Sequence, residues 1–157
     1  MLFSFRHYPN KWHVTPNWNS LKNEILENSS YSYNDLIEPE IYDSICELEY
    51  NEGITFPLVT PEYAYLHYDR LFKGKRQLTQ IQLIKVLEII NDSSNYVWGE
   101  LGTPVVNRYI SFYSESGICI GIFGVDFGGN TWATPNLARM KWGLIENMNE
   151  LMDIIEK

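Results

Sequence analysis

The chain contains few of the residues that metal sites and disulfide frameworks require. It has two cysteines and three histidines among 157 residues, and neither type occurs at Cys-x-x-Cys or His-Glu-x-x-His spacing. The longest unbroken apolar run, residues 117–125, is less than half of the ~20 residues that a membrane-spanning helix needs. The amino-terminal residues do not combine a cationic start with an apolar core, so no export signal is predicted. We therefore expect a cytoplasmic protein with no cofactor, no metal and no membrane partner.

The two cysteines, Cys46 and Cys119, both stand among apolar residues. A disulfide between them would require an oxidising compartment, so we expect two reduced, buried thiols. Cys119 also completes the pattern Gly117-Ile-Cys-Ile-Gly121, a thiol version of the nucleophile elbow. That motif needs a turn into a helix directly after the nucleophile. Apolar and β-branched residues continue to Val125 instead, and they predict that Cys119 lies within a strand.

Hydrophobic periodicity predicts helices early in the chain, strands later and a closing helix. The expected helices cover about 18–28, 38–51, 79–91 and 143–156, and the expected strands cover 63–68, 105–113, 118–125 and 131–134. Residues 73–76 are interpreted as a basic turn. Because turns and not helices separate the later strands, an antiparallel sheet is favoured. The sequence thus predicts one α+β domain over residues 1–157, a small antiparallel sheet packed against three to four helices.

Two of the expected helices carry informative patterns. The helix over 79–91 begins with a capping box, Thr79 with Gln82, and its nearly unbroken apolar residues predict a central position. The helix over 38–51 has one apolar stripe and, on a different side, the acids Glu40, Asp43 and Glu47. Gly53 is expected to end it.

Candidate catalytic groups are few. His7, His13, His67 and Asp126 are the residues able to act as acid or base in a small hydrolase. The structural interpretations are that His67 packs within a Tyr-rich strand and that Asp126 binds the backbone of its own turn. We expect no enzymatic activity, and a small hydrolase is the less favoured alternative.

A short cationic and aromatic group follows the last expected strand: Asn136, Arg139, Lys141 and Trp142. Such groups are able to stack on nucleic-acid bases. The formal net charge of −8, however, opposes binding to a phosphate backbone. We therefore expect no direct contact with nucleic acid.

The acids of the chain are concentrated in one span. Eleven of the 20 acids lie in residues 24–69, which contain no lysine or arginine, whereas the remaining residues hold nine acids and all 12 bases. Glu40, Asp43 and Glu47 are like-charged neighbours on one helix face, where each like pair costs about 0.2–0.5 kcal/mol. The fold gains nothing from this arrangement, but a field of one sign accelerates the encounter with a basic partner.

Tyrosines accompany these acids, and tyrosine is a favoured interface anchor. The predicted partner-binding surface consists of Glu38, Glu40, Asp43, Glu47, Tyr42, Tyr50, Tyr31 and Tyr33. Such a surface imitates the phosphates that a cationic protein normally binds. The alternative left open is that these acids only keep an acidic protein soluble.

With this acid block, no catalytic motif and a composition rich in Asn, Ile and Tyr, the chain resembles the immunity proteins of bacterial polymorphic and contact-dependent-inhibition toxins. The resemblance is one of overall profile, and no residue role follows from it. It implies a small, acidic α+β protein that binds and blocks a nuclease or other toxin domain in the cytoplasm. An intracellular adaptor or scaffold for another basic protein is the alternative function.

Overall fold

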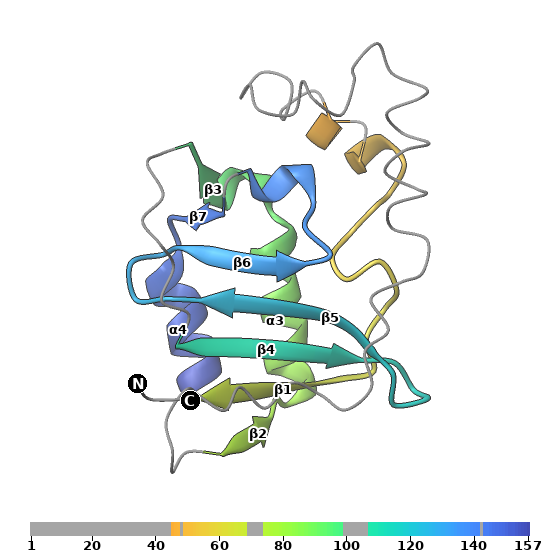
Figure 1. Ribbon diagram of the computed structural model, residues 1–157, viewed down its shortest axis with the longest axis vertical. Helices are drawn as coiled ribbons and strands as arrows, with labels where there is room; N and C mark the ends of the chain where they lie inside the picture. Colours follow the sequence, from red (N-terminus) through yellow and green to blue (C-terminus); the bar gives the residue numbers. More distant parts are fainter. Residues whose placement is uncertain (1–44, 48, 69–73, 99–106, 142) are drawn as a thin grey trace, which may run out of the picture.

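A computed structural model describes the chain over residues 45–47, 49–68, 74–98, 107–141 and 143–157. Its main feature is a five-stranded antiparallel sheet with the strand order β2-β1-β4-β5-β6 (Figure 1). The strands are β1 Tyr63–Tyr68, β2 Lys75–Gln77, β4 Arg108–Tyr113, β5 Cys119–Val125 and β6 Thr131–Thr134. A second, two-stranded sheet pairs β3 Tyr96–Val97 with β7 Leu144–Ile145.

Helices cover one face of the larger sheet. These are α3 Gln80–Asn91 and α4 Met148–Glu156, which lie behind the sheet in Figure 1. Two short 3-10 helices, η2 Ser93–Asn95 and η3 Ala138–Met140, are also present. The predicted α+β class, with an antiparallel sheet packed against helices, is therefore confirmed.

The core fills the space between the sheet and the helices. Alternate strand residues face opposite sides of a sheet, and the buried apolar ones here include Leu66, Ile110 and Phe123. The helices contribute Val86 and Leu151 to the same cluster. The alternation predicted for β1 thus separates this core face from a second, more polar face that carries Tyr63, Tyr65 and His67.

Helix α3 begins as predicted but does not take the predicted central position. The Thr79 Oγ1 accepts a hydrogen bond from the Gln82 N–H at 3.2 Å, and the Thr79 N–H donates to the Gln82 side chain at 3.0 Å, which forms the capping box. Ile81 and Ile84, however, are 69% and 56% exposed. Because α3 packs on one face of a sheet, its outer side faces away from the core despite the apolar residues there.

Two other predictions of secondary structure are wrong in part. Lys75 and Arg76 belong to strand β2 and not to a turn. The last helix begins at Met148, whereas Leu144 and Ile145 form β7. Gly143 explains the late start, because it has a φ of +87° and a Cβ there would lie 2.7 Å from the Thr131 carbonyl oxygen.

The early helices fall largely outside the described residues. The helix expected over 18–28 lies there entirely. Of the helix expected over 38–51, residues 45–47 and 49–51 are described and are helical. The chain then turns at Gly53, which has a φ of +67°, so the predicted end of this helix is confirmed. None of the helices in the described parts of the chain is long and apolar enough to cross a bilayer.

Candidate partner-binding surface

The structure places two of the eight residues of the predicted surface, Glu47 and Tyr50. They are three residues apart on the helical segment, so they lie on the same face of the helix. Both are exposed, and Tyr50 retains 76% of its accessible surface. Glu52 follows them in the turn and is exposed as well. The other six predicted residues, Glu38, Glu40, Asp43, Tyr42, Tyr31 and Tyr33, lie outside the described residues.

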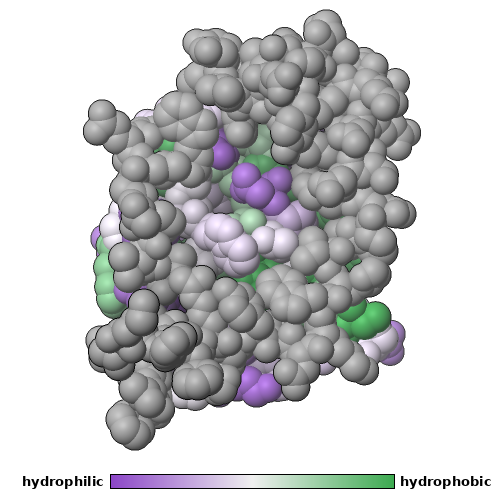
Figure 2. Space-filling model, in the orientation of Figure 1, coloured by the Kyte–Doolittle hydropathy of each residue, from purple (hydrophilic) through white to green (hydrophobic). Residues whose placement is uncertain are grey.

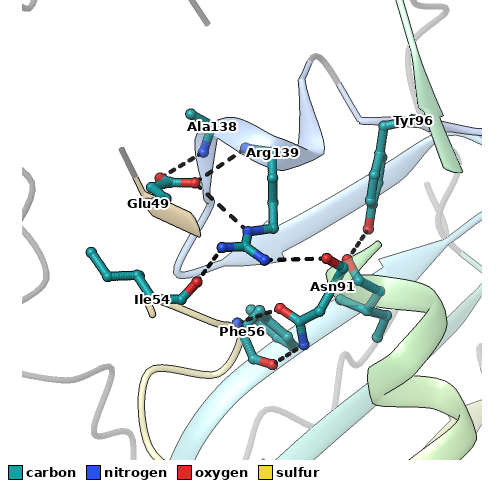
Figure 3. Close-up of polar contacts among 8 residues, drawn as sticks. Glu49, Ile54, Phe56, Asn91, Tyr96, Ala138 and Arg139 are labelled. Carbon is teal, nitrogen blue, oxygen red and sulfur yellow. Dashed lines mark hydrogen bonds and ion pairs between the residues drawn. The ribbon is translucent and has the colours of Figure 1, made fainter. Parts of the chain in front are cut away.

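Glu49 stands between these exposed residues in sequence but points into the protein, where it is 2% exposed. Its carboxylate accepts hydrogen bonds from the backbone N–H of Ala138 at 2.9 Å and of Arg139 at 3.2 Å (Figure 3). These N–H groups begin η3, where a helix start leaves donors without partners inside the helix. The Nε of Arg139 lies 3.9 Å from the same carboxylate. One acid of the 24–69 block is therefore neutralised within the fold.

Arg139 extends this network to two further segments. Its guanidinium donates to the backbone carbonyls of Ile54 and Asn91, the latter at 3.2 Å (Figure 3). The Asn91 side chain in turn pairs with the backbone of Phe56, donating to its carbonyl at 2.6 Å and accepting from its N–H at 2.7 Å. The residues that follow the acidic helix are thus bonded both to the end of α3 and to η3.

Aromatic packing holds the same segment in the core. The Phe56 ring meets Phe112 edge-on at 5.3 Å and lies 6.2 Å from Phe123. Gly121 makes room for this segment, since a Cβ at position 121 would lie 2.9 Å from the Cβ of Pro57, the residue that follows Phe56. Polar and apolar contacts therefore fix one side of the helical segment to the core. Glu47 and Tyr50 lie on the exposed side of the same segment.

Arg139, the central cation of the cationic and aromatic group, is not available to stack on nucleic-acid bases. Arg139 is buried and engaged by Glu49 and two carbonyls. The Lys141 ammonium lies 5.8 Å from the Trp98 ring. Trp142 lies outside the described residues. The guanidinium at the centre of the sequence group is a structural group, and its pairing with Glu49 is not visible in any local pattern.

His67 has the packing role that the sequence predicted for it. Its Nε2 lies 2.6 Å from the Ser111 Oγ, and its ring stacks on Tyr109 at 4.4 Å. His7 and His13 lie outside the described residues. In the described parts of the chain, no group of three His, Cys, Asp or Glu side chains is placed to hold a metal ion.

Asp126 and Cys119 also occupy the positions predicted for them. The Asp126 carboxylate accepts from the N–H of Gly128 at 2.7 Å and of Asn130 at 3.0 Å, within its own turn. Cys119 begins β5 and is buried, whereas Cys46 is only half-buried, and neither belongs to a disulfide. The expectation of a buried thiol is therefore confirmed for Cys119 and wrong for Cys46. Burial raises the pKa of the Cys119 thiol, which disfavours the thiolate that a nucleophile requires.

Sequence reasoning missed an aromatic cluster on the sheet face that points away from α3 and α4. Tyr63 and Tyr113 are paired across β1 and β4 and stack at 5.2 Å, with Tyr65 perpendicular to both at 5.8 Å. Figure 2 looks onto this side of the molecule, where many of the described side chains have intermediate hydropathy. The alternation of Tyr63, Tyr65 and His67 was the signal that places these rings together.

Comparison of the chain with protein-family models, curated proteins and solved structures finds no significant match. The fold and the exposed surface described above are therefore the basis on which a function is assigned.

Proposed function

We propose that this chain is a cytoplasmic immunity protein that binds and neutralises a basic toxin domain, with a nuclease as the favoured activity of the toxin. The proposed contact surface is the acidic, tyrosine-bearing one of Glu38, Glu40, Asp43, Glu47, Tyr42, Tyr50, Tyr31 and Tyr33. The observation that carries the proposal is the exposure of Glu47 and Tyr50 on one helix face, within a span of eleven acids and no bases.

The negative charge of the 24–69 acid span, to which this surface belongs, is largely uncompensated in the part of the span that the structure describes. Glu47, Glu52 and Glu62 are exposed and form no ion pair with any described residue, whereas Glu49 is paired with Arg139. Unpaired carboxylates project a negative field over roughly 8–10 Å at physiological ionic strength. Such a field attracts a cationic partner and raises its association rate.

The attachment of the helical segment favours tight binding. Neutralising a toxin requires nanomolar affinity or better, which corresponds to about −12 kcal/mol. A surface that is already ordered avoids the entropy cost of ordering its side chains and backbone on association. For the described residues of the surface, Glu47 and Tyr50, this order comes from the contacts that hold their helical segment. Those contacts are the hydrogen bonds of Glu49 and Arg139 and the core packing of Phe56, and none of these three residues needs to touch the partner.

The proposal predicts an upstream reading frame that ends in a cationic toxin domain, and binding kinetics with that domain test it. Glu47→Lys is expected to slow association about threefold to tenfold and to reduce its dependence on salt, because it reverses a charge in the steering field. Tyr50→Ala is expected to accelerate dissociation at least tenfold, as removal of an interface anchor does. Glu88→Lys on α3 and Phe127→Ala in the β5–β6 turn are the matched controls, because both replace exposed residues elsewhere.

The outcomes separate the proposal from its alternative. If Glu47→Lys and Tyr50→Ala bind the toxin domain as the wild type does, this surface is not the interface. If the chain binds a basic partner but does not inhibit it, the adaptor function replaces the inhibitory one.

A further inference from the structure

A hollow lies where β1 begins, beside β2 and the start of α3. It has a volume of about 370 Å³ and is lined by Glu62, Tyr63, Gln77, Leu78, Thr79 and Gln80. Among the described residues, the lining contains one carboxylate and no basic side chain. Glu62 belongs to the 24–69 acid span but not to the surface proposed above.

Backbone contacts fix Glu62 at the rim of this hollow. Its N–H donates to the Tyr113 carbonyl at 2.8 Å, and its own carbonyl accepts from the Gln80 side chain at 3.2 Å. The main chain of Glu62 is therefore held between β4 and the first turn of α3, while its carboxylate is exposed and unpaired among the described residues.

The neighbouring tyrosine cluster already holds one cation. The Lys75 Nζ lies 4.5 Å from the centre of the Tyr65 ring, which packs perpendicular to Tyr63. Aromatic faces attract ammonium and guanidinium groups through the ring quadrupole. Tyr63 presents the same chemistry next to Glu62, and it is only half-buried.

We propose that this hollow is a second docking subsite, which receives an arginine side chain of the basic partner protein. The guanidinium would pair with the Glu62 carboxylate and lie against the Tyr63 ring. Arginine fits better than lysine because its planar group both forms two parallel bonds to a carboxylate and stacks on an aromatic ring. The class of partner rests on the proposed function. The subsite lies at the β2 edge of the sheet, whereas the helical segment over residues 45–47 and 49–51 lies beyond β6 (Figure 1), so the partner would contact both ends of the sheet.

The test uses a blocked tetra-arginine peptide, titrated into the full-length chain labelled with nitrogen-15. We expect the largest amide shifts at residues 62–63 and 77–80. Glu62→Gln is expected to weaken peptide binding about threefold, in line with the loss of an exposed ion pair. Glu146→Gln, an exposed acid next to β7 at the other edge of the molecule, is expected to leave it unchanged.

A tetra-citrulline peptide, which has nearly the same shape but no charge, is the ligand control and is expected not to bind. Equal binding of both peptides, shifts that avoid the hollow, or an unchanged affinity of Glu62→Gln would overturn the subsite. Because the peptide assay needs no toxin, its failure is distinguishable from that of the proposed function. Toxin binding that is insensitive to Glu62→Gln would leave the immunity function standing and remove only the subsite.

Discussion

Single residues contribute to the proposed surface by holding its helical segment in place. Glu49 and Arg139 do so together, although they are 90 residues apart in sequence. Burying either charge alone would cost several kcal/mol, but each is paired and accepts or donates further hydrogen bonds. The sequence showed Glu49 only as one more acid of the block. Its role could not be predicted, because no local pattern reveals a partner so distant along the chain.

The pair can be tested by removing one charge at a time. Glu49→Gln and Arg139→Met are each expected to lower the free energy of unfolding by about 3 kcal/mol, because each leaves a buried charge without its partner. The double variant should lose less than the sum of the two, since the residues act together. Urea unfolding measures all three.

Glu47→Gln is the control for these variants, because the Glu47 side chain is exposed. The free energy of unfolding of this variant should stay within about 0.5 kcal/mol of the wild-type value. A fully stable Glu49→Gln protein would show that the network does not hold the helical segment.

Tyr96 predicts a dependence of stability on alkaline pH. Burial raises the pKa of its phenol well above the ordinary value of 10.0, and its hydroxyl donates to the Ile90 carbonyl at 3.0 Å. The neutral phenol is thus favoured in the folded state. The contribution of Tyr96 to the free energy of unfolding is therefore complete below pH 10 and is lost as the pH rises above it. Tyr96→Phe should cost about 1 kcal/mol at pH 7.5, from the lost hydrogen bond.

Urea unfolding of both proteins at pH 7.5, 10 and 11 checks this prediction. The difference in stability between wild type and Tyr96→Phe should narrow as the pH rises, because only the wild type has this phenol to ionise on unfolding. A difference that stays constant across the range would contradict the assignment.

At the scale of elements, the sequence predicted most of the described fold, since the decisive signals are local. Alternation identified β1, a continuous apolar run identified β5, and the Thr79–Gln82 capping box identified the start of α3. The errors arose where contacts between distant segments determine the local structure. Leu144 and Ile145 read as helical but pair with β3, and which side of an apolar helix is buried depends on the sheet it meets.

The orientation of α3 leads to a prediction that compares two isoleucines of one helix. Ile90 is completely buried, and Ile90→Ala should cost about 2–5 kcal/mol through lost contacts and a cavity. Ile84 is exposed, so Ile84→Ala should cost less than about 1 kcal/mol, partly offset by the better helix propensity of alanine. Thermal and urea unfolding of the two variants measure the difference. Equal losses would mean that the outer side of α3 is buried after all.

At the scale of the whole molecule, the distribution of charge is the property that suggests a function. The sequence shows that eleven acids share a span without bases, but it does not show which of them stay exposed. The described residues add that Glu47, Glu52 and Glu62 are exposed while Glu49 is used internally. A helical segment that is held firmly against the core and carries unpaired carboxylates and an exposed tyrosine is well suited to binding a cationic protein.

The survival of bacteria that express the cognate toxin domain tests the proposed immunity function most directly. Cells that also produce this chain should grow, whereas cells that produce a Glu40→Lys, Asp43→Lys and Glu47→Lys triple variant at the same level should die. Cells that die despite abundant wild-type protein, or that survive equally well with the triple variant, would contradict neutralisation through this acidic surface.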